Sequence, residues 1–460
     1  MRKLLVLTQV VHFIFYSIIA VGFKKLEGKF ENALILERGV AMKRIRWWSM
    51  VLLGVMMVVL SACNSPTATE ESRDYFKVGV ITSLSGSEVY GGNVTKRGYE
   101  IWAETVNEQG GIEIDGKKYR VELVYADDQS DPTSGADAAE RMITSEKVDF
   151  ILGPYTSGVT LAVAPILEKY KVPMITGSAE SPLIWKEQFK YTFGTIPAVD
   201  LTGSSPIRTL ARDVNPAPKT IAIIGVNDPF SKSVAETFKS SAEEAGMEVV
   251  KYDIVPAGTD FTPLISAIKK LNPDILAVGG HEKEHMEVIK ASKSLGFMPK
   301  IFVMHYGITT PDFIKNLGKD ADYVMGAAIW TPDLNYEDPL FGSTAEYVKK
   351  FTEKYGTAPE YTEAGCTATG IVFTAALQAI GAKPPLSEEE REKLVEALEN
   401  IEVNTLFGPI SFATEGAWYH NNTGLQPLTI QLKDGKQIIV GPADVRVQAP
   451  TYPVPPMESR

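Results

Sequence analysis

The sequence predicts an α/β fold that is divided between two lobes. Short apolar runs alternate with amphipathic segments in two successive blocks, at about 76–198 and 199–330. Alternation of this kind is typical of parallel sheets that are covered by helices on both faces. The 460 residues also exceed the length at which one hydrophobic core keeps growing. We therefore expect two Rossmann-like sheets rather than one large domain.

The first block opens with the apolar run FKVGVIT at 76–82, which predicts a buried strand. Apolar residues at helical spacing predict a helix over 94–106, which stops at the glycine pair 110–111. Asp131 and Pro132 predict another helix start, because aspartate is a good N-cap and proline is tolerated at the first helical position. The remaining runs predict strands at 119–126, 149–153 and 172–177 and a helix at 157–170.

The second block repeats this rhythm and is followed by a helical stretch that is too short for a third domain. We expect strands at 220–226, 248–255, 274–279 and 300–304, helices at 338–355, 362–380 and 387–400, and a hairpin that turns at 433–436. The chain should therefore cross between the lobes more than once, through a hinge with several crossings. We assign 76–198 plus 331–424 to lobe 1, 199–330 plus 425–446 to lobe 2, and 447–460 to a C-terminal tail.

Residues 42–62 have the pattern of an export signal. A basic segment at 43–46 precedes a 13-residue apolar run at 47–59, and small residues then precede Cys63. Leu60 to Cys63 (LSAC) resembles the lipobox of bacterial lipoproteins, in which the cysteine is acylated and becomes the new N-terminus. We expect Cys63 to be a lipid anchor, followed by a polar tether up to residue 75. The alternative is an uncleaved helix, although 13 residues fall short of the ~20 that span a bilayer.

Residues 1–41 fit less well in front of a signal peptide. They contain a second apolar run at 4–23, whereas an export signal does not normally follow another hydrophobic segment. The residues Glu37, Arg38 and Gly39 can be encoded by a purine-rich string like a ribosome-binding site, just ahead of Met42. We expect translation to start at Met42, with a true membrane helix in 1–41 as the alternative.

Charge and cysteine content exclude several classes of function. Residues 1–62 carry a net charge of +6, so the rest of the chain carries −17. So acidic a surface repels phosphate backbones and makes nucleic acid an unsuitable partner. Two cysteines cannot form a disulfide framework, and Cys366 lies in an apolar helical stretch where we expect a buried thiol.

The segment His281-Glu-Lys-Glu-His285 matches the HExxH pattern of zinc proteases, in which both histidines lie within a helix. Here two glycines precede His281, so we place this residue in a loop at a strand end and expect a solvated helix start instead of a metal site. The segment Gly153 to Gly158 is not a serine-nucleophile elbow, and phosphate-binding glycine motifs are missing. We therefore expect neither enzymatic activity nor a metal or other cofactor.

The stretch GPYTSGV at 153–159 is the best candidate for binding. It follows a predicted strand and opens a helix, so its backbone N–H groups and the hydroxyls of Thr156 and Ser157 can hold an anionic group. A similar loop, 177–181, ends the next strand. Two ordinary strand-to-helix turns remain the alternative.

From Phe76 to about Gly441 the chain resembles the type I periplasmic binding proteins, in particular the branched-chain amino-acid and amide receptors of ABC importers. The resemblance rests on segments in a specific order: KVGVITSLSG, GGNVTKRGYEIWAETVNEQGGI, YADDQSDP, ILGPYTSGVTLAVAPILEKYKVPMIT, VPAGTDFTPLISAIKKLNPDIL and FGPISF. It implies a type I periplasmic binding protein fold in which two lobes close around a small solute.

The resemblance also implies a set of ligand-binding residues. A serine and the backbone groups that hold a carboxylate in the amino-acid-binding members fall on Ser157 and on Ser178, Ala179 and Glu180, with Thr156 as a further donor. Aromatic positions fall on Tyr90 and Phe230, and a cleft tyrosine is replaced by His281. The acidic residue that meets the ligand's ammonium aligns with Tyr306, so Glu180 is the residue that could supply a charge.

These observations predict a lipid-anchored, extracytoplasmic receptor that delivers a small amino acid, or a related carboxylate or amide, to an ABC permease with its ATPase. We expect a monomer. Alternatives are an aromatic acid, an amide or urea as ligand, a sensory receptor of the same fold, and, least favoured, a zinc hydrolase.

Overall fold

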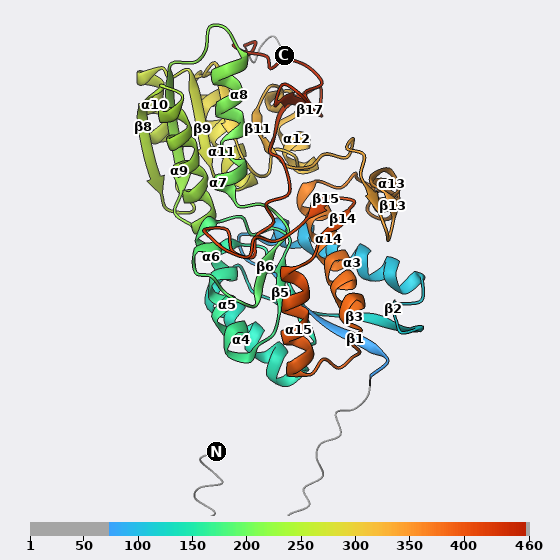
Figure 1. The fold of residues 1–460 in the computed structure, drawn as a ribbon. Coiled ribbons are helices and arrows are strands. Elements are labelled where there is room, and N and C mark those ends of the chain that lie inside the picture. The colour runs from blue at the N-terminus through green and yellow to red at the C-terminus, as the bar shows by residue number, and fades with distance from the viewer. Residues whose placement is uncertain (1–72, 457–460) are drawn as a thin grey trace, which may run out of the picture. The chain divides into compact units, whose positions relative to one another are not determined.

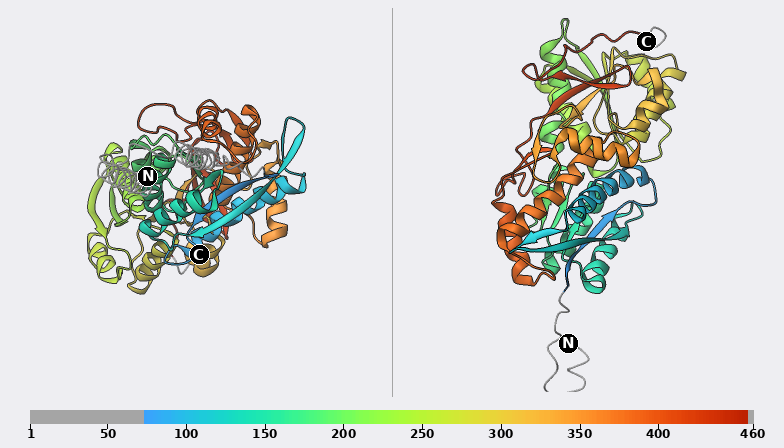
Figure 2. Two further views of the ribbon diagram at one scale, coloured as in Figure 1. Left: turned by 90° about the horizontal axis from the view of Figure 1, so that it is seen from below. Right: turned by 90° about the vertical axis from the view of Figure 1, so that its right-hand side faces the viewer.

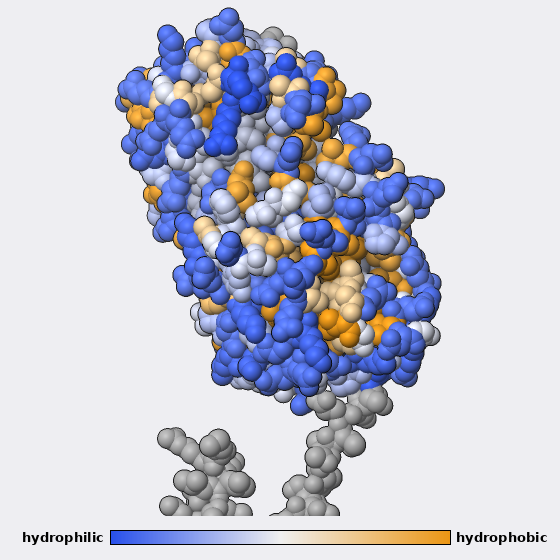
Figure 3. All heavy atoms as spheres, viewed as in Figure 1, coloured by the Kyte–Doolittle hydropathy of each residue, from blue (hydrophilic) through white to orange (hydrophobic). Residues whose placement is uncertain are grey.

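The structure is a computed structural model that describes residues 73–456, which belong to one compact unit, Glu71–Arg460. The predictions for residues 1–41, for the signal peptide at 42–62 and for Cys63 lie outside the described residues. None of the described helices is long and apolar enough to cross a membrane. Figure 3 shows a mainly hydrophilic face on which apolar residues form small separate patches.

The first sheet has six strands in the order β2-β3-β1-β4-β5-β6 (Figure 1). All neighbouring strands are parallel except the β2–β3 hairpin. The strands are β1 (Tyr75–Thr82), β2 (Ile112–Ile114), β3 (Lys117–Asp127), β4 (Phe150–Leu152), β5 (Met174–Thr176) and β6 (Thr192–Gly194). The buried strands of this sheet correspond to the apolar runs of the first block.

The second sheet has seven strands in the order β17-β16-β11-β10-β9-β7-β8. Five parallel strands come from the second block, and the antiparallel hairpin β16–β17 joins them from far along the chain. The strands are β7 (Thr220–Val226), β8 (Glu248–Val255), β9 (Ile275–Gly279), β10 (Ile301–Met304), β11 (Met325–Ala328), β16 (Leu428–Lys433) and β17 (Lys436–Gly441). Two mainly parallel sheets confirm the prediction of an α/β fold that is divided between two Rossmann-like sheets.

Helices pack around both sheets. Around the first sheet are α3 (Val89–Glu108), α4 (Pro132–Arg141), α5 (Ser157–Tyr170), α6 (Pro182–Lys186), α13 (Thr344–Tyr355), α14 (Tyr361–Ile380) and α15 (Glu388–Glu399). Around the second are α7 (Val199–Thr202), α8 (Ser205–Asp213), α9 (Pro229–Glu244), α10 (Thr262–Leu271), α11 (Glu282–Ser294) and α12 (Pro311–Leu317). Short elements complete the chain: a π-helical turn (Met142–Glu146), a 3₁₀ turn (Gly318–Ala321), β12 (Glu337–Asp338), β13 (Gly342–Ser343), β14 (Val403–Thr405) and β15 (Gly408–Ile410).

Helices α3 and α14, blue and orange in Figure 2, lie side by side although some 250 residues separate them. The buried indole of Trp102 packs against Gly370, where an added Cβ would overlap the ring. Its Nε1 donates to the Thr374 hydroxyl at 3.3 Å. Through this contact α14 packs beside the first sheet, although it follows the strands of the second block in the sequence. The chain therefore comes back to the first lobe, as predicted.

Two details differ from the predicted elements. The helix predicted over 338–355 begins at Thr344, because the preceding residues form the β12–β13 hairpin. Helix α3 begins at Val89, one turn before the apolar periodicity predicts. The predicted cap at Asp131 is confirmed, since its carboxylate accepts the Ser134 N–H at 2.8 Å.

Asparagine side chains join the segments that run between the sheets. Asn421 Oδ1 accepts the Ala198 N–H at 2.7 Å, and its Nδ2 donates to the Ile196 carbonyl at 2.8 Å. Asn422 Nδ2 donates to the Thr195 carbonyl at 3.0 Å. The 194–198 and 420–422 segments are therefore cross-linked where the chain passes from one sheet to the other. The lobe boundaries drawn from the sequence remain a prediction.

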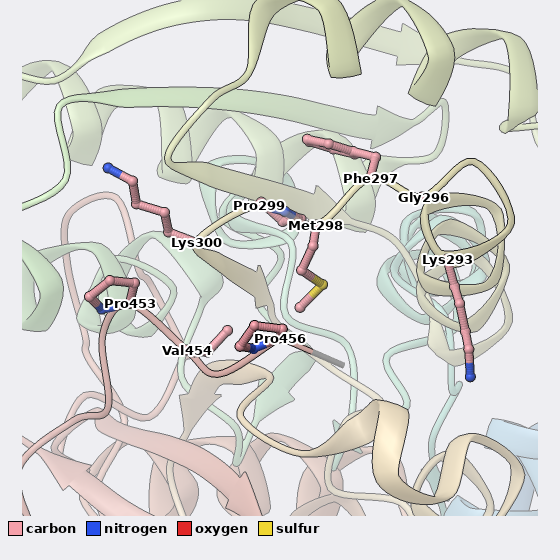
Figure 4. A pocket seen from close by; sticks show the side chains of 9 residues that line it. All are labelled: Lys293, Gly296, Phe297, Met298, Pro299, Lys300, Pro453, Val454 and Pro456. Carbon is pink, nitrogen blue, oxygen red and sulfur yellow. The ribbon is translucent and has the colours of Figure 1, made fainter. Parts of the chain in front are cut away.

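The C-terminal segment packs on the second sheet. Gln431 exchanges two hydrogen bonds with the Thr451 backbone, at 3.0 and 2.9 Å, and the Val454 N–H donates to the Lys300 carbonyl at 2.9 Å. Beside these contacts a surface groove opens between the loop before β10 and residues 453–456 (Figure 4). The part of the predicted tail that the structure describes is therefore docked onto the second sheet.

Candidate functional site

A narrow cavity of about 10 Å³, room for about one water molecule, lies where the carboxyl ends of strands from both sheets meet. Its walls come from the residues that follow β4, β5, β7, β9 and β10, which is the edge where α/β sheets usually bind ligands. Eight residues line it: Tyr155, Thr156, Ser157, Ser178, Glu180, Phe230, His281 and Tyr306. Among residues 73–456, no lysine or arginine lines this cavity.

The N-terminus of helix α5 supplies donors to the cavity. Thr156 caps the helix, and its Oγ1 accepts the Val159 N–H at 3.2 Å. Ser157 Oγ accepts the Ser181 N–H at 3.1 Å. Because each hydroxyl is an acceptor in these bonds, each still has a proton to donate. The first-turn N–H groups of Ser157 and Gly158 have no carbonyl acceptor within the helix. This end of the cavity therefore suits an anionic or strongly accepting group.

Glu180 lines the cavity from the loop after β5 and is almost fully buried. Its Oε1 accepts a hydrogen bond from the Tyr361 hydroxyl at 3.1 Å, and its Oε2 lies 3.4 Å from Nε2 of His305. Burial raises the pKa of Glu180 to about 8; the Tyr361 hydrogen bond lowers this pKa and the nearby Glu360 carboxylate raises it by less, so burial decides the direction. The Glu180 carboxyl is therefore protonated at neutral pH.

His281 enters the cavity from the residue that precedes α11. Its Nδ1 lies 3.4 Å from the Tyr155 hydroxyl and 3.8 Å from the Glu88 carboxylate, and its Nε2 lies 3.9 Å from Asp228. Burial alone would lower the pKa of His281, but the carboxylates of Glu88, Asp228 and Glu284 together raise it. A protonated His281 would form ion pairs with Glu88, which follows β1 of the first sheet, and with Asp228, which follows β7 of the second.

Aromatic rings cover the remaining wall. Phe230 lies 5.1 Å from His281 and 6.5 Å from Tyr306, measured between ring centroids, and Tyr155 lies 6.2 Å from Tyr306. Rings at these distances give a ligand both apolar contact and polar edges. The cavity thus joins a donor end, at α5, to an aromatic wall that contains one carboxyl.

Comparison with known proteins identifies the architecture that carries this cavity. A family model described as "Periplasmic binding protein" matches residues 76–435. The chain belongs to the periplasmic binding protein family. A Leu/Ile/Val-binding protein homolog of Brucella abortus is 27% identical over 74% of this chain and 86% of its own. A leucine-, isoleucine-, valine-, threonine- and alanine-binding protein of Pseudomonas aeruginosa is 26% identical over 75% and 87%.

Solved structures show the same fold. A leucine binding protein of Thermotoga maritima superposes with a TM-score of 0.69 at 23% identity, over 80% of this chain and 100% of its own. A solute binding protein of an ABC transporter from R. palustris, in complex with benzoate, gives a TM-score of 0.65 at 23% identity, over 80% and 96%. Both likenesses concern the fold of this periplasmic binding protein, and the two proteins differ in what their names say they bind.

Seven of the nine ligand-binding residues predicted from the sequence line the cavity of this periplasmic binding protein: Thr156, Ser157, Ser178, Glu180, Phe230, His281 and Tyr306. Their contact with a ligand stays a prediction. The sequence analysis missed Tyr155, which lies inside the segment that it singled out. No local pattern indicates its role: the Tyr155 ring lies over Gly91, where an added Cβ would overlap it, and this contact joins distant segments.

The loop after β5 does not offer the donors that the sequence predicted. The N–H groups of Ser178 and Ala179 both donate to Thr176 Oγ1, at 3.3 and 3.1 Å. The single proton of the Ser178 hydroxyl is shared between the carbonyls of Pro154 and Tyr155, at 3.2 and 3.1 Å. Ala179 is buried and lies outside the cavity lining. The expectation that this loop donates to a carboxylate is corrected for Ser178 and Ala179, because their donors are already engaged within the protein.

Two further predicted residues differ from the rest. Tyr90, on α3, lies outside the cavity lining and near Thr310 at the start of α12. Burial raises the pKa of Glu180 to about 8, which favours the uncharged carboxyl at neutral pH, so a charge on Glu180 stays a prediction.

His281, the first histidine of the HExxH-like segment, lies where the sequence predicts it, between the end of β9 and the start of α11. The expectation of a solvated helix start is wrong, since His285 is fully buried and Glu282 nearly so. His285 Nε2 lies 3.2 Å from the Val278 carbonyl, and burial lowers the pKa of His285 to about 3. Within residues 73–456 no group of three metal-ligating side chains is found.

Proposed function

We propose that this protein is the extracytoplasmic, lipid-anchored solute receptor of an ABC importer, and that it holds a small amino acid or a related carboxylate or amide between its two lobes. The observation that carries the proposal is the donor end of the cavity, where Thr156, Ser157 and the first turn of α5 face a space lined from both sheets. Helix N-termini bind carboxylates without a charged side chain.

Membership of the family supports the transport role. The curated relatives are named as Leu/Ile/Val-binding proteins, and one solved relative is a branched-chain amino acid transporter substrate binding protein of Streptococcus pneumoniae in complex with isoleucine. The protein would release its solute to a permease driven by an ATPase, with the membrane reached through Cys63. No bond is made or broken; hinge closure traps the solute.

An aromatic acid is the second candidate ligand. The rings of Tyr155, Phe230 and Tyr306 form much of the cavity wall, and aliphatic side chains are missing from the lining within the described residues. One structural relative was solved with benzoate and another with 3,4-dihydroxybenzoic acid. An aromatic ring would pack on this wall while its carboxylate met the α5 terminus.

A thermal-shift panel tests the proposal. Residues 64–460 would be melted with the twenty amino acids, small amides, urea, benzoate and aliphatic acids. A ligand at 100 times its dissociation constant adds about 2.7 kcal/mol to the free energy of unfolding, a shift that is easily measured. We expect at least one carboxylate or amide to raise the melting temperature; a panel without any shift would refute the proposal.

A further inference from the structure

A buried carboxyl and a buried imidazole lie next to each other at the cavity wall. Glu180 faces the cavity, whereas His305, at the end of β10, is buried behind it and is not part of the lining. Glu180 Oε2 and His305 Nε2 are 3.4 Å apart. Within the described part of the chain, neither Nδ1 nor Nε2 of His305 has a hydrogen-bond partner, so the Glu180 carboxyl is near the imidazole without being hydrogen-bonded to it. Among the carboxyl groups of residues 73–456, only that of Glu180 lies within 4 Å of the His305 imidazole nitrogens.

The surroundings of this pair contain no fixed positive charge. From α14, the Tyr361 hydroxyl donates to Glu180, and the buried Glu360 carboxyl faces them both. From α11, the neutral imidazole of His285 faces His305. Neither Glu180 nor Glu360 forms an ion pair with a lysine or arginine among residues 73–456. Buried carboxyls are normally paired with a cation, so this cluster lacks its usual partner.

Burial determines where the proton lies. It raises the pKa of Glu180 to about 8 and lowers the pKa of His305 to about 4. The pair is therefore neutral at pH 7, with the proton on the carboxyl. A cation that enters the cavity beside Glu180 would favour the carboxylate and so shift the proton toward the imidazole.

We propose that His305 is a positioning residue that takes the proton of Glu180 when a cationic nitrogen of the ligand enters the cavity, so that Glu180 meets this nitrogen as a carboxylate. The proton moves from Glu180 Oε2 to His305 Nε2: one O–H bond breaks, one N–H bond forms, and no other reactant takes part. The inference rests on the proposed function and narrows it to solutes that carry an amino group as well as a carboxylate.

The test compares L-leucine with 4-methylpentanoate, which differs from it only by the missing amino group. Titration calorimetry in two buffers of different ionisation enthalpy gives both the affinity and the number of protons exchanged. We expect the wild type to bind L-leucine at least ~10-fold more tightly than 4-methylpentanoate, with little net proton exchange, because His305 keeps the proton. Glu180→Gln should abolish this preference.

The variant His305→Gln separates the positioning role from a structural one. Without the imidazole, L-leucine binding at pH 7 should release about one proton and weaken about 10-fold, and it should recover near pH 9, where Glu180 ionises unaided. Loss of affinity that is equal at both pH values would overturn the role of His305. Circular dichroism melting would check that each variant is folded.

Other outcomes distinguish this inference from the proposed function. If the wild type binds 4-methylpentanoate or benzoate more tightly than L-leucine, the inference is wrong and the receptor role stands. If L-leucine does not bind at all, the inference is likewise overturned. The thermal-shift panel and the variant Ser157→Ala, which act at the other end of the cavity, then decide separately whether the proposed function stands.

Discussion

Ser157 Oγ accepts the backbone N–H of Ser181 at 3.1 Å, and this bond ties together the loops that follow two neighbouring strands, β4 and β5. The geometry leaves the serine proton free to point into the cavity. One hydroxyl thus has a structural contact on one side and a donor for a ligand on the other.

Ser157→Ala should weaken ligand binding. Losing one hydroxyl bond to a charged group costs about 1.5–3 kcal/mol, which corresponds to about 10- to 150-fold in affinity. Titration calorimetry with the ligand found in the panel measures this loss. Ser178→Ala is the matched control, because the Ser178 hydroxyl donates to two protein carbonyls, and it should change the affinity much less. A larger loss for Ser178→Ala would contradict the proposed donor end.

His285→Ala should destabilise the protein and leave metal content unchanged. The side chain is fully buried and bonded to the Val278 carbonyl, so its removal leaves a cavity and costs about 2–4 kcal/mol of unfolding free energy. Urea denaturation measures this cost. His281→Ala, at the cavity, should retain stability and change binding. If a chelator destabilises the wild type as much as the His285→Ala substitution does, the result would instead favour a metal site.

Tyr90→Phe should weaken closure of the two lobes. It removes the hydroxyl that lies near Thr310 and leaves the ring in place; losing one neutral hydrogen bond made on closure costs about 0.5–1.5 kcal/mol, or roughly 2- to 12-fold in affinity. Calorimetry gives the affinity, and small-angle scattering gives the compactness with ligand bound. Tyr170→Phe removes a hydroxyl bond to Glu140 that is remote from the cavity and should bind as the wild type does.

Stability should fall as the pH rises from about 4.5 to about 7, in part because of Glu282. Burial, and then the carboxylates of Asp312 and Glu360, raise the pKa of Glu282 to about 7. The folded state therefore holds a proton that the unfolded state loses above about pH 4.5, and this contribution, at most ~3 kcal/mol, is lost between pH 4.5 and 7.

Glu282→Gln should flatten that part of the pH profile, because glutamine stays neutral throughout. Chemical denaturation at pH 5, 6, 7 and 8 would show it. Glu353→Gln, at a largely exposed carboxylate on α13, is the control and should keep the wild-type slope. A Glu282→Gln profile as steep as that of the wild type would show that Glu282 does not contribute.

Cys63→Ser should release the protein from the membrane fraction. The lipobox-like LSAC and the preceding export signal predict acylation of this thiol. Two acyl chains anchor a protein stably in a membrane, whereas one chain gives only marginal binding. Fatty-acid labelling and fractionation measure the change. Cys366→Ser is the control, since Cys366 is buried in α14 and should never be labelled. Label retained in Cys63→Ser would contradict the anchor.

The sequence alone determined most of the fold and part of the candidate site. Apolar runs at 76–82 and 220–226 became interior parallel strands, and the cap at Asp131 is a local contact that a four-residue window reveals. Such features depend on hydrophobic periodicity and on hydrogen bonds between near neighbours, so they can be read without the tertiary structure.

Only the tertiary structure decided which of these side chains contact one another, and how burial shifts the pKa values of the ionisable ones. The Tyr155 ring fits over Gly91, and His305 stands behind Glu180 more than a hundred residues away, because strand order brings separate loops to one edge. His285 lies in a segment that reads as solvated, yet packing removes it from water. Burial and the direction of a side chain depend on contacts between distant segments, and no local pattern encodes them.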